Sequence, residues 1–529
     1  MISRVAALLL AAALSLAAAD KGLNPQDILG PLGKHWPTFN GDYSGARYSS
    51  LKQIDASNVG TLTLAWVLQT RSASIKSMPL MVHGILYFTT PDNVWAADAH
   101  TGRIIWHFDR PSKGDHIGNR GVGMWKDTLY FETPDCHLIF IDAKNGKMKK
   151  DIQLADPKLG YFATMAPLVI HDHVVVGVSG DVTDIPGFLE SLDPVTGKVQ
   201  WRWWTEPLKK GDPGSDTWPD MGAMRHGGGM TWVTGTYDPQ LNQLYWGIGN
   251  PNPVLAGSGR KGANLYTCSI VSLNPDTGKL NWYFQASPHD THDWDAVQTP
   301  VIINGTVNGA PEKLVAQASR NGYFFVLDRQ TGEHVVTAPM NSSINWALGI
   351  GKNGVPIPNP KKQPSPDGTL VSPSSSGVTN WLAPSYDPQT GLFYVSARRT
   401  WSMFYMTATG KPEGWAGRDK GVFTSSSVAA IDYQTGAVRW RHKIGDGFGS
   451  AGILTTAGHL LFTADNSGNL LALNPATGET LWHVPLGARM SSAPSTYELD
   501  GRQYLLTPAG NVIFAWALPR GAAKSQVSP

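Results

Sequence analysis

Apolar runs along this chain end repeatedly in the same short polar motif. Seven segments place Asp or Asn after an apolar residue and continue into a turn ending in T-G or N-G; five of them reach a Trp at a constant position. The five are A-D-A-H-T-G-R-I-I-W (97–106), L-D-P-V-T-G-K-V-Q-W (192–201), L-N-P-D-T-G-K-L-N-W (273–282), I-D-Y-Q-T-G-A-V-R-W (431–440) and L-N-P-A-T-G-E-T-L-W (473–482). Degenerate copies lie at 141–147 and 327–333, and the closest copies are about 42 and 44 residues apart.

Each copy has the features of a strand, a tight turn and a second strand. The Asp or Asn side chain can bond the turn backbone, and Gly is free to adopt positive φ. The Trp that ends the second strand suits the gap between neighbouring sheets. One small sheet cannot bury both of its faces, so such units must stack in a ring. The pattern therefore predicts an all-β protein, a β-propeller with tryptophan-docking repeats, rather than a sandwich with chance T-G turns.

The two ends of the repeat region predict how the ring closes. The last apolar run, N-V-I-F-A-W-A-L (511–518), has no T-G partner, and L-T-L-A-W-V-L (62–68) precedes the first repeat. Pairing of these two runs would remove an exposed sheet edge. Residues 206–226 and 340–377 lack a strand pattern and are expected to be insertions, of a length that often forms lids or partner surfaces.

The composition supports many short strands and excludes some partners. The chain holds 57 Gly, 37 Pro and 20 Trp, carries a net charge of +2 and is 16% charged, with no basic run. Nucleic acid is therefore not an expected partner. Cys136 and Cys268 are too few for a disulfide framework, and either pair or form two buried thiols. No C-x-x-C-H motif occurs, so we expect no covalently attached c-type haem.

The first 19 residues have the layout of a secretory signal peptide. Arg4 precedes an apolar, Ala-rich run that ends in small residues before Asp20. We expect cleavage near Ala19, with an uncleaved anchor as the alternative. No later stretch is long and apolar enough to span a membrane. Residues 20–529 are thus predicted to be one exported domain, periplasmic or secreted.

One stretch concentrates ionisable side chains in this weakly charged sequence. S-P-H-D-T-H-D-W-D-A-V-Q-T-P (287–300) contains two histidines and three aspartates within seven residues. It is compatible with a solvated acidic loop, with a zinc site on His289 and His292, or with the acid–base groups of an enzyme.

Together, the repeats and three motifs resemble the pyrroloquinoline quinone (PQQ)-dependent alcohol dehydrogenases, the relatives of methanol dehydrogenase. The motifs are W-P-T-F-N-G-D-Y-S-G-A-R-Y-S (36–49), G-N-P (249–251) and D-W-D (293–295), and the resemblance extends to the C-terminal strand. It implies an eight-bladed propeller that binds PQQ and a metal ion on its axis. Scaffold propellers without a quinone share the repeat, so each site residue has to be considered separately.

Matching the family motifs residue by residue gives a set of candidate PQQ contacts. Arg120 of G-N-R-G would hold a carboxylate of the quinone in a bidentate fork, Trp232 would stack on its rings, and Arg320 would bond its carbonyl oxygens. The remaining matches are Thr164, Ser179, Gly180 and Asn380.

The resemblance also assigns the metal and the base. Asn250 matches a neutral metal ligand, and Asp293 matches the catalytic aspartate that takes the alcohol proton as hydride leaves for the quinone. Asp295 falls where lanthanide-using relatives carry an added aspartate, whereas calcium-using relatives carry Ala or Ser. The implied cofactors are therefore PQQ and Ca²⁺ or a lanthanide ion.

Three departures from the family pattern bear on activity. Val182 stands where the metal-binding glutamate is expected, and Asp181 or Asp184 would have to replace it although neighbouring residues of a strand point in opposite directions. Lys76 replaces an acidic residue of the first blade and could pair with a quinone carboxylate. The vicinal disulfide of many relatives is absent, with Gly114-Asp115 in its place.

These observations favour an exported quinoprotein that oxidises an alcohol and passes electrons to a separate acceptor, such as a soluble cytochrome c. Two alternatives remain open at this stage. One is a non-catalytic propeller that acts as a scaffold or ligand-binding protein, which Val182 and Lys76 would favour. The other is a propeller hydrolase or sugar-binding protein that uses the acidic cluster.

Overall fold

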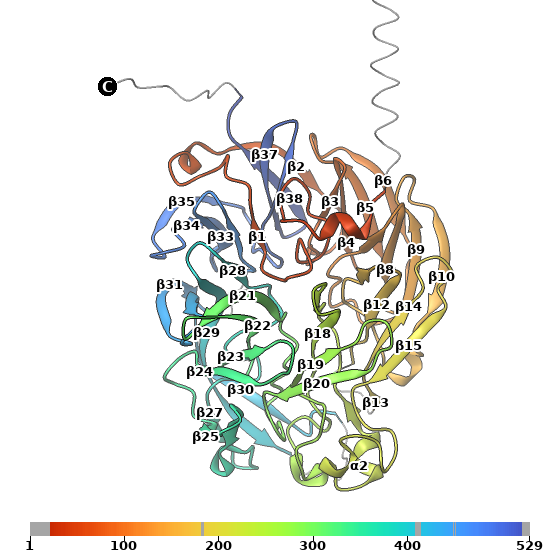
Figure 1. Ribbon diagram of the computed structural model, residues 1–529, viewed down its shortest axis with the longest axis vertical. Helices are drawn as coiled ribbons and strands as arrows, with labels where there is room; N and C mark the ends of the chain where they lie inside the picture. The colour runs from red at the N-terminus through yellow and green to blue at the C-terminus, as the bar shows by residue number, and fades with distance from the viewer. Residues whose placement is uncertain (1–21, 181–184, 408–413, 448, 450, 521–529) are drawn as a thin grey trace, which may run out of the picture.

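The sheets of this protein form a closed ring. The computed structural model describes residues 22–180, 185–407, 414–447, 449 and 451–520. Within these residues there are eight sheets of four or five strands, and Figure 1 shows them arranged around a common centre. The β-propeller predicted from the repeats is therefore confirmed.

Six of these sheets follow one another along the chain. They are β3 (Leu80–Val82), β4 (Ile85–Thr90), β5 (Asn93–Asp98) and β6 (Ile104–Asp109); β7 (Gly123–Trp125), β8 (Thr128–Glu132), β9 (His137–Asp142) and β10 (Met148–Gln153); β11 (Leu168–Ile170), β12 (His173–Gly177), β14 (Phe188–Leu192) and β15 (Val199–Trp204); β17 (Thr236–Asp238), β18 (Gln243–Gly247), β19 (Ser269–Leu273) and β20 (Leu280–Gln285); β21 (Val301–Val307), β22 (Ala310–Ala318), β23 (Tyr323–Asp328) and β24 (His334–Pro339); and β27 (Thr369–Val371), β28 (Ser385–Asp387), β29 (Leu392–Met406), β30 (Gly417–Asp432) and β31 (Val438–Asp446).

Two sheets combine strands from both ends of the chain. They are β1 (Tyr48–Ser49) with β32 (Leu454–Thr456), β33 (Leu460–Ala464), β34 (Asn469–Leu473) and β35 (Thr480–Pro485), and β2 (Thr63–Gln69) with β36 (Ser495–Leu499), β37 (Arg502–Ala509) and β38 (Val512–Ala517). β2 pairs antiparallel with β38, and the red and blue ends of the chain lie side by side at the top of Figure 1. The predicted ring closure between the N- and C-terminal runs is confirmed.

The remaining elements are short. They are η2 (Pro25–Ile28), η3 (Val59–Thr61), η4 (Pro157–Leu159), η5 (Ser215–Thr217), α2 (Met221–Arg225), η6 (Gly257–Arg260) and η7 (Pro360–Lys362), with the two-strand pairs β13 (Ile185–Pro186) and β16 (Gly227–Gly228), and β25 (Ala347–Ile350) and β26 (Pro356–Pro358). Segment 340–377 thus contains β25, β26 and β27, so the expectation that it lacks strands is wrong. Among the helices of the described residues, none has the length and apolarity that a bilayer crossing requires.

The T-G turns have the bonding that their sequence predicts. Asp98 Oδ1 accepts hydrogen bonds from the backbone N–H groups of His100 (3.0 Å) and Thr101 (2.9 Å). Gly102 has φ +71°, a conformation in which a side chain would be strained.

The repeat tryptophans join each sheet to its neighbour. Trp106, on β6, donates from Nε1 to the carbonyl oxygen of Ala143 (3.0 Å), and a Cβ on Gly146 would lie 2.6 Å from its ring. Equivalent indole-to-carbonyl bonds join Trp66 to Ala99, Trp201 to Pro275, Trp282 to Arg329 and Trp440 to Pro475. The motif is therefore the device that packs one blade on the next.

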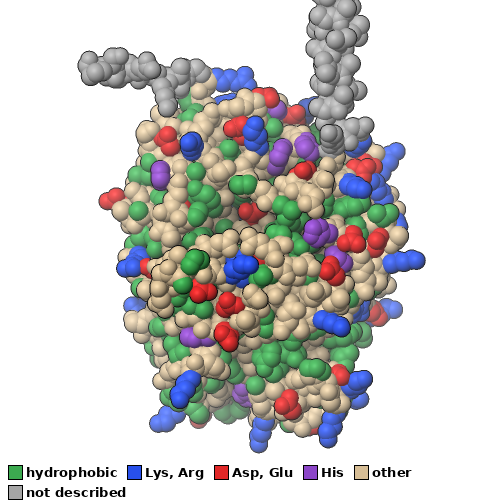
Figure 2. Space-filling model, in the orientation of Figure 1, with side chains coloured by type: hydrophobic (Ala, Val, Ile, Leu, Met, Phe, Trp, Pro, Cys, Tyr) green, Lys and Arg blue, Asp and Glu red, His purple; other side chains and the backbone are tan. Residues whose placement is uncertain are grey.

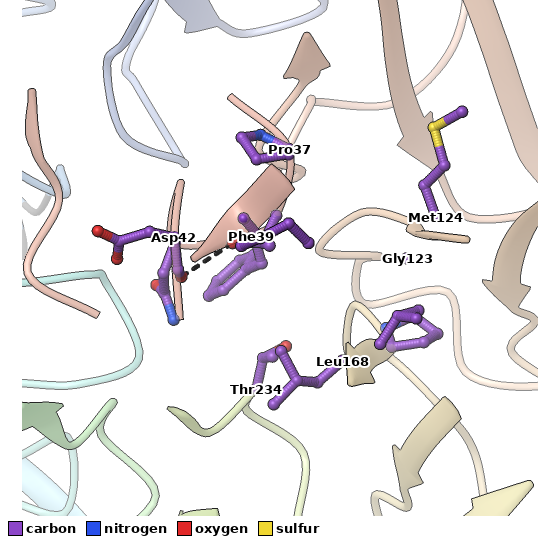
Figure 3. Close-up of a pocket in the computed structure, with 12 residues that line it drawn as sticks. Pro37, Phe39, Asp42, Gly123, Met124, Leu168 and Thr234 are labelled. Atoms are coloured by element: carbon purple, nitrogen blue, oxygen red, sulfur yellow. Dashed lines mark hydrogen bonds between the residues drawn. The ribbon is translucent and has the colours of Figure 1, made fainter. Parts of the chain in front are cut away.

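A segment near the N-terminus fills the axis of the ring. Phe39 is buried against Met78, Ala166, Ala383 and Ala493, which directly precede or begin the first strands of four different sheets. Figure 3 shows Phe39 and Asp42 of this segment beside a small cavity, whose walls include the starts of β7 and β11. None of the residues lining that cavity is a predicted cofactor or metal contact, so the candidate site has to be sought elsewhere on the axis.

Candidate active site

The predicted site residues gather at one end of the axis, either before the inner strand of a sheet or in the turn after the strand that follows it. The inner strands are buried and the outer ones are not, since β3 is buried throughout whereas β6 is largely exposed. Backbone bonds link the residues that precede them: Met78 N–H donates to the carbonyl of Arg120, and Arg120 N–H donates to that of Thr164, both at 3.0 Å. Positions far apart in sequence thus meet because each lies before an inner strand or after the strand paired with it, and both points are at the same end of an antiparallel pair.

The acidic cluster forms an ion-pair group with one arginine. Arg320 donates from Nη2 to Asp293 Oδ2 (2.5 Å) and from Nη1 to Asp295 Oδ2 (2.7 Å). Asp293 is 4% exposed and Asp295 is completely buried. The interpretation of this stretch as a solvated acidic loop is therefore wrong, and the D-W-D motif directs both carboxylates toward the same guanidinium.

Asp295 also connects three parts of the site. Its Oδ1 accepts a hydrogen bond from the backbone N–H of Asn250 (2.7 Å), and its Oδ2 accepts one from Trp232 Nε1 (3.2 Å) in addition to that from Arg320. Burial raises the pKa of Asp295, and the charge of Arg320 opposes that rise. Asp293, Asp295 and Asn250 therefore lie together, as the family pattern implied.

A second group surrounds Arg120. Its guanidinium carbon lies 4.7 Å from the ring centres of both Trp232 and Trp381. Arg120 Nη1 donates to Thr164 Oγ1 (2.5 Å), and the hydroxyl oxygens of Thr164 and Ser179 are 3.1 Å apart. Sequence reasoning missed Trp381, although it directly follows Asn380 in T-N-W.

Lys76 and Gly180 complete this group. The Nζ of Lys76 donates to the carbonyl oxygen of Ile117. Partial burial lowers the pKa of Lys76, and the positive charge of Arg120 lowers it further. Gly180 has φ +142° and follows Ser179 at the end of the described segment 22–180.

Asn380 belongs to a turn that two arginines support. Arg320 Nε donates to the carbonyl of Ser375 (2.8 Å), while Arg398 Nη1 (3.3 Å) and Asn380 Nδ2 (3.2 Å) donate to that of Ser376. Burial lowers the pKa of Arg398 to about 10, and the nearby charge of Arg320 contributes. Arg398 is a site cation that sequence reasoning missed; the signal was an R-R pair inside an apolar strand.

The loop that carries Asp293 is fixed from behind by Asp290 and Arg260. Asp290 Oδ2 accepts hydrogen bonds from the backbone N–H groups of His292, Asp293 and Trp294 at 2.9–3.3 Å. The buried Arg260 donates to the carbonyl of Asp290 (2.5 Å) and to that of Pro253 in the loop after Asn250. This brace ties the two candidate metal-binding loops together.

The two histidines of the cluster have structural contacts. His292 lies parallel to Trp294 with ring centres 4.2 Å apart, and its Nε2 lies 2.8 Å from the carbonyl of Lys362. His289 Nδ1 lies 2.9 Å from the carbonyl of Gly262. Burial lowers the pKa of both histidines to about 4. No group of three or more His, Cys, Asp or Glu suited to a metal occurs in the described parts of the chain, so a zinc site on these histidines has no support.

Two further sequence expectations can be placed. Cys136 and Cys268 are buried and unpaired, so the alternative of two separate thiols is correct. The described residues do not include Asp181, Val182 and Asp184. Replacement of the family glutamate by Asp181 or Asp184 therefore remains a prediction from the sequence.

Family models and relatives show which known proteins this chain is similar to. Residues 36–341 match the model described as "Glucose/ethanol/alcohol dehydrogenase, beta-propeller domain", and residues 424–519 match "Outer membrane protein assembly factor BamB". The chain is 34% identical to a quinohemoprotein alcohol dehydrogenase of Comamonas testosteroni, covering 90% of this chain and 72% of that protein. It is 32% identical to the quinoprotein alcohol dehydrogenase PedH of Pseudomonas putida, covering 95% and 91%.

Solved structures give the same result. The quinohemoprotein alcohol dehydrogenase from Comamonas testosteroni superposes with a TM-score of 0.87 at 30% identity, over 94% of this chain and 82% of that one. A europium-containing methanol dehydrogenase superposes with a TM-score of 0.83 at 28% identity, over 92% and 98%. The chain therefore belongs to the PQQ-dependent alcohol dehydrogenase family.

Proposed function

We propose that this protein oxidises an alcohol by hydride transfer to PQQ, with Ca²⁺ or a lanthanide ion as Lewis acid and Asp293 as general base. Electrons then pass to a separate acceptor such as a soluble cytochrome c. The single observation that carries the proposal is the joining of Asp293, Asp295, Asn250, Trp232 and Arg320 in one buried cluster. An exported location, based on the first 19 residues, is part of the same proposal.

The cations of the site fit a planar tricarboxylate. Within the described residues, Arg320 contacts both aspartates, Arg398 lies near Arg320, and Arg120 and Lys76 lie near each other on the Trp232 side of the site. An excess of cations favours a polycarboxylate, and arginine forks suit carboxylates. Trp232 would supply a flat surface for the rings, and the guanidinium of Arg120 lies over that indole, 4.7 Å from its ring centre.

The oxygen ligands fit a hard cation. Asp293, Asp295 and the side chain of Asn250 offer carboxylate and amide oxygens, the ligand types that Ca²⁺ prefers. A trivalent lanthanide would gain most from the second carboxylate, that of Asp295. When bound, the quinone and the metal supply a hydride acceptor polarised by a Lewis acid.

The residues of this chain then provide binding and proton transfer. Asp293 is the buried carboxylate that would take the hydroxyl proton of the alcohol, and Arg320 holds its Oδ2 so that the other oxygen can face the substrate. Arg260 and Asp290 keep this loop at a constant distance from Asn250. Burial of the group excludes water from the reacting atoms.

The test is binding of PQQ to the purified mature protein. Binding is measured by the quenching of tryptophan fluorescence, in separate titrations with Ca²⁺, with La³⁺ and with a chelator present. Arg120→Ala removes a charge-assisted contact, worth about 1.5–3 kcal/mol, and should raise Kd about 10- to 100-fold. Arg399→Ala, at an exposed position outside the cluster, is the matched control. Metal-dependent binding that needs Arg120 would support the proposal, and dye-linked oxidation of primary alcohols should accompany it. No saturable binding with any metal would refute it and favour a scaffold.

A further inference from the structure

The longest hairpin of the protein has one face toward the candidate site. β29 has 15 residues and β30 has 16, and they pair along almost their whole length. On the inner face, Thr400 Oγ1 accepts a hydrogen bond from Ser374 N–H (2.9 Å), and Asp419 Oδ2 accepts one from Ser375 Oγ (2.9 Å). The same turn receives the Nε–H of Arg320 at the carbonyl of Ser375. The hairpin therefore supports a residue of the proposed active site directly.

The opposite face of this hairpin is apolar and exposed. Side chains alternate along a strand, so Trp401 and Met403 point away from Thr400 and the site. Phe423 is paired with Trp401 across the sheet, and Leu370 of β27 is paired with Met403. Phe423 is 46% and Leu370 41% exposed, and Trp401 and Met403 are half-buried. We call these four residues the hairpin face.

Basic residues border the hairpin face. Lys420 is paired with Met403, Arg418 lies over the ring of Tyr405 at 5.4 Å, and Arg399 precedes Trp401 by two residues. All three cations are exposed, and Asp367 is an exposed acid at the β27 edge. An apolar centre with a charged rim is the composition of a transient protein interface, and the excess of cations favours an acidic partner.

Figure 2 shows basic, acidic and apolar side chains interspersed on the face that it presents. In Figure 1 the labels of β27, β29 and β30 lie together on the lower left of the ring. The hairpin face thus combines exposed apolar residues and a cationic rim on strands that also support the site.

We propose that the hairpin face docks the electron acceptor, an acidic one-electron redox protein. The inference rests on the proposed function, because oxidation of one alcohol to its carbonyl product releases two electrons and two protons. Two acceptor molecules take the electrons in turn, and the protons go to solvent. Docking here places the acceptor on the strands whose inner face holds the turn bonded to Arg320.

The experiment compares acceptors of opposite charge on the enzyme loaded with PQQ and metal. The probes are an acidic and a basic c-type cytochrome, and phenazine methosulfate as a small acceptor that needs no docking. At low salt the wild type should reduce the acidic cytochrome with a kcat/KM about 10-fold above that for the basic one, and added salt should remove the difference.

The decisive variant reverses three charges, Arg399→Glu, Arg418→Glu and Lys420→Glu. It should lower kcat/KM for the acidic cytochrome at least about 10-fold, raise it for the basic one, and leave the dye rate unchanged. Phe423→Ser should lower both cytochrome rates without changing their salt dependence.

The matched control reverses three other exposed lysines, Lys209, Lys210 and Lys279, and should behave as wild type. Unchanged cytochrome rates in the Arg399, Arg418 and Lys420 variant would overturn the docking site. The docking site would also be overturned if that variant lost only its binding to vesicles containing anionic lipid, or lost only its self-association in analytical sedimentation. Absence of dye-linked activity in the wild type would instead refute the proposed function itself.

Discussion

The removal of Asp295 is the perturbation with the clearest expected result, because this carboxylate joins three segments of the site. It accepts hydrogen bonds from Asn250 N–H, Trp232 Nε1 and Arg320 Nη1. Asp295→Ala would leave three buried donors without this acceptor and Arg320 with one fewer carboxylate. Asp295→Asn keeps the volume and one acceptor oxygen but turns an NH₂ group toward a donor.

The magnitude follows from the donors that lose their acceptor. Arg320 keeps its ion pair with Asp293, but the three buried donors that Asp295 accepts from are left unsatisfied, at about 1–3 kcal/mol each before the site relaxes. Asp295→Ala should therefore lower the free energy of unfolding by about 3–5 kcal/mol, and Asp295→Asn by somewhat less. In the presence of PQQ, Asp295→Ala should also lower the affinity for La³⁺ more than the affinity for Ca²⁺.

The assay is urea unfolding followed by tryptophan fluorescence, with metal titrations on the folded variant. Asp109→Ala removes an aspartate that is exposed and is the control, with an expected change within about 0.5 kcal/mol. Equal unfolding midpoints for Asp295→Ala and the control would show that Asp295 does not hold the cluster together. An unchanged ratio of La³⁺ to Ca²⁺ affinity would remove it from the metal ligands.

Three other predictions concern the folded state. Burial raises the pKa of Asp290 to about 6, so this carboxyl binds a proton more tightly in the folded protein than in the unfolded chain, and the wild-type free energy of unfolding should fall as the pH rises from about 4 through 6. Over that window Asp290→Asn should gain about 1–3 kcal/mol relative to wild type. Parallel plots of stability against pH for the two proteins would contradict the assignment. Trp201→Ala should lower the free energy of unfolding by about 3–5 kcal/mol because the indole packs on the next blade. The control, Trp415→Ala, changes an exposed residue and should have a small effect. Similar urea unfolding midpoints for the two variants would disprove the packing role. Burial raises the pKa of Cys136 and Cys268, so a thiol reagent should label neither in the native protein and both after denaturation; rapid native labelling would exclude their burial.

The sequence alone was sufficient for the architecture, because the repeat is a local signal. The Asp or Asn, the glycine and the Trp of each motif act within one turn or on the adjacent blade, so their spacing records the fold directly. Ring closure between 62–68 and 511–518 followed from two unpaired apolar runs. The strands of 340–377 were missed because short pairs such as β25 and β26 carry little periodicity and depend on the sheet beside them.

For the site, the sequence supplied residue types and the tertiary structure supplied their partners. D-W-D and G-N-P could be read locally, and the structure brought Asn250, Asp293 and Asp295 together. That Arg320 bridges both aspartates, or that Trp381 and Arg398 join the group, could not be derived from spacing. These side chains come from different blades, with Arg320 in the turn after β22, Trp381 before β28 and Arg398 within β29, and only closure of the ring brings them together. Burial there, not local pattern, decides which charges must pair.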